Sequence, residues 1–293
     1  MKAYVFPGQG SQYPGMGKDL YSSSKLAKEL FLTADEILGF NISEIIFNGS
    51  KEDLKETQIT QPAIYIYSVI LSKIIGEKFK PKFVAGHSLG ELSALTAIKT
   101  ISYEDGLKLV SKRAFEMQNA CEKIPGTMAA ILGIEDKIVE QVCDEINGEV
   151  VTANYNCPGQ IVISGEIKAV QTACEKLKQL NAKRALILPV GGAFHSPLMK
   201  SAKNEFAKEI ELIKFNEPIC PIYQNYTASP VLNPNDIKKN LIQQITSPVK
   251  WTQTIKNISS DGVNEFIEVG PGKVLQGLIK KILPNKKSYS LEI

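Results

Sequence analysis

The chain has 293 residues, which is enough for about two domains of typical size or for one domain that carries an inserted subdomain. Hydrophobic residues make up 43% of the chain and charged residues 22%, with 34 Lys and Arg against 31 Asp and Glu. This composition argues against disorder, and the net charge of +3 is too small to favour nucleic acid as the main partner.

The cysteines and the apolar runs bear on the compartment. The five cysteines include no Cys-x-x-Cys pair and have no histidine cluster nearby, so neither a disulfide framework nor a zinc site is expected. The N-terminus lacks the apolar core of a signal peptide, and apolar runs such as 63–71 are far too short to span a bilayer. We therefore expect a cytoplasmic protein that does not bind a membrane.

The first part of the chain predicts strands that lead through turns into helices. Residues 2–6 form an apolar run that the turn residues 7–12 end, and 82–86 form another before small and apolar residues. Residues 102–105 resemble a capping box, which marks the start of a helix. The expected order is a strand at 2–6, amphipathic helices to about residue 76, a strand at 82–86, a buried helix, and a helix from 102 to about 125.

The order of elements changes in the middle of the chain. A strand–helix–strand–strand–helix–strand order is typical of the ferredoxin-like unit, in which two helices cover one face of a four-stranded sheet. We therefore expect residues 126–190 to be an inserted subdomain and residues 1–125 and 191–293 to form the catalytic core. The expected elements are strands at 128–133, 150–156, 160–165 and 182–190, and helices at 135–147 and 167–181.

The last part of the chain returns to an α/β pattern. Ser196 and Pro197 are a plausible N-cap and first residue of a helix that runs to about Glu211. Residues 266–272 predict a strand and a turn before a last helix at 274–282. The outer segments together predict an α/β core.

The segment Gly86-His87-Ser88-Leu89-Gly90 matches the G-x-S-x-G nucleophile elbow. It lies between a short apolar strand and a helix rich in Ala and Leu, which is the context that the motif requires. Glycines at both ends allow a tight turn that presents the Ser88 hydroxyl at a helix N-terminus, where backbone N–H groups can stabilise an anion. The alternative is a serine that only caps a helix after a tight turn.

A serine hydroxyl needs a base to become a nucleophile, and the chain has only two histidines, His87 and His195. The side chain of His87 should point away from that of its neighbour Ser88. His195, in the loop before a predicted helix, is the better candidate for the general base. A loop histidine with no catalytic role is the alternative.

The loop 7–12 resembles a dinucleotide-binding loop, but Tyr13 stands where the third glycine of G-x-G-x-x-G belongs. A tight glycine loop after a strand can instead aim a backbone N–H at an oxyanion. Gln9 is the candidate donor here, beside the N–H of Leu89. A purely structural turn explains the loop equally well.

Arg113 lies at the edge of the apolar stripe of the helix that follows the elbow helix, so its guanidinium can be buried. Such an arginine more often reaches solvent or holds a structural ion pair. An acyl substrate that carries a charge would favour the buried position.

Taken together, the motifs resemble the malonyl-CoA:acyl carrier protein transacylases, an acyltransferase family of fatty acid and polyketide synthesis. The resemblance covers nearly the whole chain and depends on the order of its motifs. They are FPGQGSQYPGMG at the start, TQPA (60–63), GHSLGE (86–91), KR (112–113), NYNCPGQ (154–160), GAFHSPLM (192–199), TSPVKW (246–251) and EVGPGKVL (268–275).

This resemblance implies an α/β-hydrolase-like core with a ferredoxin-like insertion. It implies ping-pong transfer of a malonyl group from the coenzyme A thioester to the phosphopantetheine thiol of acyl carrier protein, without cofactor or metal. We expect the protein to be a monomer. The roles that it implies are Ser88 as nucleophile, His195 as base, the backbone carbonyl of Gln244 as the group that orients the imidazole, Gln9 and Leu89 as the oxyanion hole, Arg113 as partner of the malonyl carboxylate, and Gln61 and Asn156 as residues that line the site.

Other functions use some of the same features. A serine esterase or thioesterase of the α/β-hydrolase class would transfer the acyl group to water, and an acyltransferase of a polyketide pathway would take another acyl-CoA. A module that only binds acyl carrier protein would need neither Ser88 nor His195. One position differs from the family pattern: Gly191 stands where the related motif before the catalytic histidine has a serine. Acyl carrier protein is usually acidic, so the candidate docking residues are the basic pairs Lys238-Lys239, Lys280-Lys281 and Lys286-Lys287.

Overall fold

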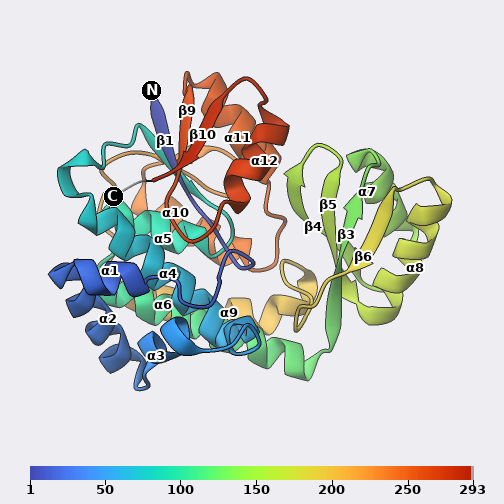
Figure 1. Cartoon of the computed structure of the whole chain (residues 1–293). Helices are drawn as coiled ribbons and strands as arrows, with labels where there is room; N and C mark the ends of the chain where they lie inside the picture. The colour runs from blue at the N-terminus through green and yellow to red at the C-terminus, as the bar shows by residue number, and fades with distance from the viewer. Residues whose placement is uncertain (292–293) are drawn as a thin grey trace.

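Two β-sheets organise the chain, and Figure 1 shows them in separate lobes. The structure is a computed structural model and describes residues 1–291. The larger sheet has the order β10-β9-β1-β2-β7-β8, and its neighbours are parallel except for β7 and β8. Its strands are β1 (Lys2–Phe6), β2 (Phe83–Gly86), β7 (Ile222–Tyr223), β8 (Pro230–Val231), β9 (Glu265–Glu268) and β10 (Lys287–Ser290).

Helices cover both faces of the larger sheet. Successive side chains of a strand point to opposite faces, so Ala3 and Val5 of β1 pack in one apolar cluster and Tyr4 and Phe6 in the other. The smaller cluster includes α11 (Trp251–Ser260) and α12 (Val274–Ile282). The larger includes α1 (Lys18–Ser23), α2 (Lys25–Leu38), α3 (Ile42–Asn48), α4 (Thr57–Ile74), α5 (Gly90–Ala97), α6 (Tyr103–Lys123), α9 (Lys200–Leu212) and α10 (Pro234–Gln244).

The smaller sheet is antiparallel, with the order β4-β5-β3-β6. Ala129 and Ile131 of β3 pack against its two helices, whereas Met128 and Val162 face the large apolar cluster. This arrangement confirms the predicted α/β fold with a ferredoxin-like unit. Its elements are β3 (Gly126–Leu132), α7 (Asp136–Glu145), β4 (Val150–Cys157), β5 (Gln160–Glu166), α8 (Ile167–Gln179) and β6 (Arg184–Ile187).

The segment after α10 connects the two sheets. The Val249 N–H donates to the carbonyl of Ala153 over 2.8 Å, and the Tyr155 N–H donates to the carbonyl of Val249 over 2.9 Å. The pairing of β4 with β5 shifts register on both sides of the Asn154–Tyr155 pair, so β4 is irregular at this contact. The contact holds β4 beside the carboxyl ends of the strands of the large sheet, where the elbow lies.

The structure differs from the sequence-based expectations in a few elements. The strands β7, β8 and β10 were not expected, because the first two have only two residues each and β10 is a polar edge strand. Ser196 and Pro197 are the N-cap and first residue of a helical segment, as predicted, but the segment opens with a 3₁₀ turn, η3 (Pro197–Met199), before α9. The Ser196 hydroxyl does not cap this segment and donates instead to the carbonyl of Ala193.

The cysteines and the helices bear on where the protein is expected to act. All five cysteines are free and buried. Burial raises the pKa of Cys143 and of Cys220 to about 12, so these thiols stay protonated and poorly reactive. Among residues 1–291, no helix has both the length and the apolar character that a membrane crossing needs.

Candidate active site

The turn between β2 and α5 places Ser88 in a strained conformation. Ser88 has a φ of 53°, in the left-handed region that side chains other than glycine rarely adopt. A Cβ on Gly86 would lie 1.9 Å from the carbonyl carbon of Gly90, and a Cβ on Gly90 would lie 2.1 Å from the carbonyl oxygen of Phe6. Both glycines are therefore needed for close backbone approach, as the elbow motif predicts.

Ser88 and His195 lie within hydrogen-bond distance. Ser88 Oγ is 2.7 Å from His195 Nε2, and His195 Nδ1 is 2.9 Å from the carbonyl oxygen of Gln244. A carbonyl oxygen only accepts hydrogen bonds, so Nδ1 carries the proton and Nε2 presents its lone pair to the serine hydroxyl. Burial, with the nearby charge of Arg113, lowers the pKa of His195 to about 3. The imidazole is therefore neutral at physiological pH, the form that a general base requires.

Arg113 projects from α6 into the same site and is only 2% exposed. One terminal nitrogen donates to Gln61 Oε1 over 2.7 Å, and the other donates to Ser88 Oγ over 3.0 Å and to Gln244 Oε1 over 3.1 Å. Burial lowers the pKa of Arg113 to about 10, against the opposing effect of Glu91, so the group is still charged at neutral pH. Within residues 1–291 no carboxylate forms a salt bridge with it.

A cavity of about 190 Å³ opens in front of these side chains, between the two lobes. Most of the residues singled out from the sequence line it. Gln244 is not a lining residue, but it bonds to His195 and Arg113, which are. The small lobe contributes an apolar wall. The lining residues are Gln9, Gln61, His87, Ser88, Leu89, Arg113, Met117, Met128, Asn154, Asn156, Val162, Leu188, Val190, Phe194 and His195.

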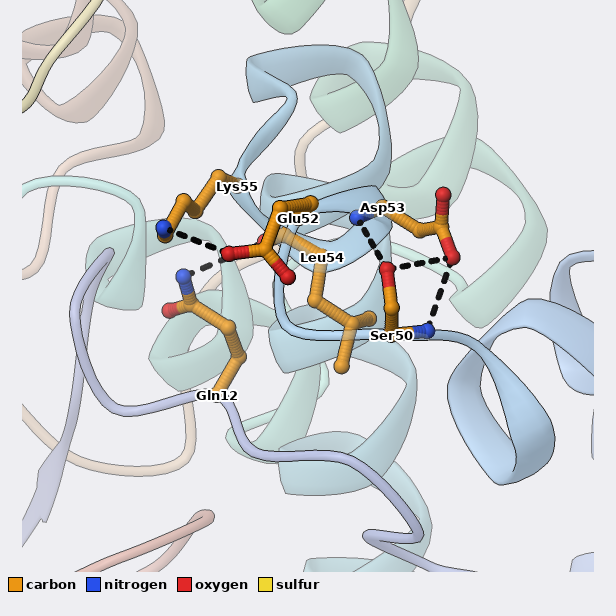
Figure 2. A network of polar contacts seen from close by, with 6 residues as sticks. All are labelled: Gln12, Ser50, Glu52, Asp53, Leu54 and Lys55. Atoms are coloured by element: carbon orange, nitrogen blue, oxygen red, sulfur yellow. Dashed lines mark hydrogen bonds and ion pairs between the residues drawn. The ribbon is translucent and has the colours of Figure 1, made fainter.

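The loop that carries Gln9 is held from both sides. The Gly10 N–H donates to Gln12 Oε1 over 2.8 Å, and Gln12 Nε2 donates to the carbonyl of Leu54 over 3.2 Å. Figure 2 shows this amide reaching the turn 50–55, which is closed by bonds of its own. A Cβ on Gly8 would lie 2.4 Å from the carbonyl oxygen of His87, so the loop packs directly on the elbow.

Two backbone donors at the cavity are free. Among residues 1–291 neither the Gln9 N–H nor the Leu89 N–H has an acceptor. Asn156 lies on the small lobe, and its Oδ1 is 2.9 Å from His87 Nε2. The His87 ring thus points away from Ser88, as expected. The structure brings all eight predicted site residues together.

Two buried residues that contact the elbow were not foreseen. Asn225, just after β7, bonds to the backbone on both sides of His87. Glu91 follows in α5, and burial raises the pKa of its carboxyl to about 8. The sequence gives no signal for Asn225, because the strand before it is too short to recognise. Glu91 belongs to the GHSLGE motif, but the motif does not reveal its contacts.

The basic pairs do not line the cavity, as far as the described residues show. They lie on α10, on α12 and at the start of β10. Several already have partners. Lys238 Nζ is 3.8 Å from Glu211, Lys239 Nζ is 3.7 Å from Asp236, and Lys286 Nζ donates to Asn264 Oδ1 over 2.7 Å.

Comparison with known proteins identifies the family. Residues 3–291 match the acyl transferase domain family. The chain belongs to this family. Among the relatives of this acyl transferase is the malonyl CoA-acyl carrier protein transacylase of Bacillus subtilis, strain 168, which is 44% identical over 99% of this chain and 92% of its own. The enzyme of the same name from Staphylococcus aureus, strain MRSA252, is 40% identical over 99% of this chain and 95% of its own.

Solved acyl transferases share the whole fold. An acyl carrier protein S-malonyltransferase from Vibrio cholerae superposes with a TM-score of 0.95 at 41% identity, over 99% of this chain and 96% of that one. A malonyl-transacylase in complex with a type II PKS acyl-carrier protein superposes with a TM-score of 0.94 at 37% identity, over 99% and 95% of the two chains.

Proposed function

We propose that this acyl transferase moves the malonyl group of malonyl-CoA to the phosphopantetheine thiol of acyl carrier protein and so supplies fatty acid synthesis. The observation that carries the proposal is Arg113. Its buried cation donates to Ser88 Oγ and has no carboxylate partner within the described residues. An acyl group that brings its own carboxylate to Ser88 would provide that partner. The names of the relatives support the same reaction.

In the first half of the reaction, Ser88 Oγ attacks the thioester carbonyl of malonyl-CoA. His195 Nε2 takes the hydroxyl proton as the new C–O bond forms, and the free N–H groups of Gln9 and Leu89 donate to the oxyanion. The C–S bond then breaks, and protonated His195 gives its proton to the coenzyme A sulfur. The products are free coenzyme A and a malonyl ester on Ser88.

In the second half, the phosphopantetheine thiol of acyl carrier protein takes the place of coenzyme A. His195 removes the thiol proton, the sulfur attacks the ester carbonyl, and the same N–H groups hold the oxyanion. The C–O bond to Ser88 breaks and its oxygen regains the proton from His195. This order of events gives ping-pong kinetics.

Selectivity for malonyl follows from the cost of an unpaired buried cation. Malonyl-CoA would pair with Arg113, whereas acetyl-CoA would leave the guanidinium without a carboxylate. Gln61 holds one end of that guanidinium and so fixes its direction. We assign Asn156 to the wall of the acyl pocket, where it holds the ring of His87.

The rest of the chain has a place in this proposal. The segments 1–125 and 191–293 form the catalytic core, and 126–190 form the subdomain that closes the acyl pocket. The complex of a related transacylase with an acyl carrier protein supports the same type of partner here. The free buried cysteines are compatible with the cytoplasm, where we expect the enzyme to act.

Intact-mass spectrometry tests the reaction. The wild type is mixed with malonyl-CoA beside a Ser88→Ala variant and an acetyl-CoA control, and phosphopantetheinylated acyl carrier protein is then added. We expect a malonyl adduct on the wild type only, and its passage to the carrier. Release of malonate without transfer would indicate a thioesterase. Absence of any adduct would contradict the catalytic assignment and leave a binding module.

A further inference from the structure

We propose that Asn225 is a positioning residue that holds the elbow in its strained conformation and so orients Ser88 toward His195. The inference rests on the proposed function, since it concerns how fast Ser88 is acylated. Asn225 is fully buried and lies outside every motif recognised in the sequence.

The sheet register places Asn225 beside the elbow. Strand β7 runs parallel to β2, with Val84 opposite Ile222 and Ala85 opposite Tyr223. Both strands end at the same edge of the sheet, so the residues that follow them remain neighbours. The turn of the elbow and the segment that follows β7 therefore meet at this edge of the sheet.

One planar amide bridges the turn. Asn225 Nδ2 donates to the carbonyl of Gly86 over 2.6 Å, and Asn225 Oδ1 accepts the Ser88 N–H over 2.7 Å. These groups lie on either side of His87, so the amide fixes the chain just before and just at the strained residue. An amide offers a donor and an acceptor at this spacing whatever the pH, whereas an alkyl side chain offers neither.

The backbone and the side chain of Asn225 are themselves held in place. The backbone N–H donates to Glu91 Oε1, the backbone carbonyl accepts the Lys250 N–H over 3.2 Å, and the side-chain oxygen also accepts from Gln244 Nε2 over 3.4 Å. Gln244 Nε2 donates to the carbonyl of Ser88 over 3.1 Å. Both backbone groups of Ser88 are therefore bonded to buried side chains, as a residue in a sparsely populated conformation requires.

This arrangement also decides which N–H groups face the substrate. Because the Ser88 N–H is occupied by Asn225, the next free donor along the chain is that of Leu89. The bridge thus occupies the backbone N–H of Ser88 and leaves the backbone N–H of Leu89 for the oxyanion. Loss of the bridge should move the nucleophile and one oxyanion donor together.

The test compares Asn225→Leu and Asn225→Ala with the wild type. Asn225→Leu keeps the approximate size and removes both the donor to Gly86 and the acceptor for Ser88, and Asn225→Ala removes both and leaves a cavity. The measured quantities are the single-turnover rate of malonyl-Ser88 formation by quenched-flow mass spectrometry and the thermal midpoint. The affinity for malonyl-CoA is measured on the same changes in a Ser88→Ala background. Asn257→Ala is the matched control, because Asn257 Nδ2 donates to the carbonyl of Ala228 over 2.9 Å without contacting the elbow.

We expect the acylation rate to fall by about 100-fold in Asn225→Ala, which is the effect of a misplacement of about 1 Å, with affinity within about threefold of the Ser88→Ala parent. The rate in Asn225→Leu should fall by a similar factor, and Asn257→Ala should keep the wild-type rate. If Asn225→Ala does not fold, Asn225→Leu, which leaves no cavity, decides the question. A folded variant that acylates at the wild-type rate, or a loss confined to affinity, would overturn the proposal. Absence of acylation in the wild type would instead contradict the proposed function.

Discussion

Replacement of Arg113 by alanine separates recognition of the malonyl carboxylate from the chemistry on Ser88. A guanidinium has five N–H donors, and within residues 1–291 Arg113 makes three hydrogen bonds, to Gln61, Ser88 and Gln244. An Arg–carboxylate pair is commonly bidentate, so a malonyl carboxylate that displaces the Ser88 or Gln244 contact would make two charge-assisted hydrogen bonds with the guanidinium. Charge-assisted hydrogen bonds contribute about 1.5–3 kcal/mol each, so loss of two costs about 3–6 kcal/mol. That corresponds to a fall of about 10²- to 10⁴-fold in kcat/KM for malonyl-CoA.

The assay measures kcat/KM for loading with malonyl-CoA and with acetyl-CoA. Acetyl-CoA has no carboxylate, so its loading should change by less than about tenfold, and the preference for malonyl-CoA should narrow by the difference. Lys112→Ala is the control, because Lys112 immediately precedes Arg113 in α6 and pairs with Glu116 over 2.9 Å, away from the cavity. An equal fall for both substrates would show that Arg113 acts on Ser88, and unchanged malonyl loading would remove it from the site.

Three further changes probe the site and the turns that support it. The pKa of His195 is lowered from 6.5 to about 3, so its base form persists as the pH falls through 6.5. The rate at which a sulfonyl fluoride inactivates the free enzyme should therefore fall only well below pH 6.5. A fall centred near pH 6.5 would contradict the lowered pKa of His195. Gly90→Ala places a Cβ 2.1 Å from a carbonyl oxygen of β1, so we expect a loss of about 1–3 kcal/mol or more in a urea denaturation curve, and a wild-type midpoint would refute the close packing. Gln12→Ala removes the two hydrogen bonds that hold the loop of Gln9, so we expect kcat for loading to fall by about tenfold or more. Complete loss of one oxyanion donor costs about 10²-fold. A change in KM alone would argue against it.

The part of the site that depends on local chemistry was predictable from the sequence. The turn at Ser88 needs glycine on both sides for steric reasons, so the motif reports the conformation directly. A strand such as β1 is apolar on both faces and is recognised without knowledge of its neighbours. The βαββαβ order likewise predicted the small sheet, because most of its elements are long enough to show their own periodicity. The exception is β6, which has four residues and is shorter than the predicted strand at 182–190.

The part that depends on distant partners was not predictable without the resemblance. The position of Arg113 in α6 is compatible with solvent or with burial, and its bonds to Gln61 of α4 and Gln244 of α10 decide between them. Asn225 follows a strand of two residues that exists only through its pairing with β2 and β8. The contacts of Arg113 and of β7 join segments far apart in the chain, so no local pattern reports them. Ser196 differs in a local way: it stands at an N-cap position, but its hydroxyl donates to the carbonyl of Ala193, three residues earlier.

The choice of a backbone carbonyl to orient His195 fits the charge that the proposed substrate brings. Gln244 offers its carbonyl to His195 Nδ1 and its side-chain oxygen to Arg113 over 3.1 Å, so the two acceptors belong to one residue. An aspartate in that place would put a carboxylate beside the guanidinium, where it would pair with Arg113 and compete with the malonyl carboxylate. It would also favour protonation of the imidazole, against the lowered pKa that keeps His195 a base. A neutral acceptor holds the ring and adds no carboxylate that would pair with the guanidinium, so a Ser-His pair without an acid suits an acyl group that brings its own carboxylate.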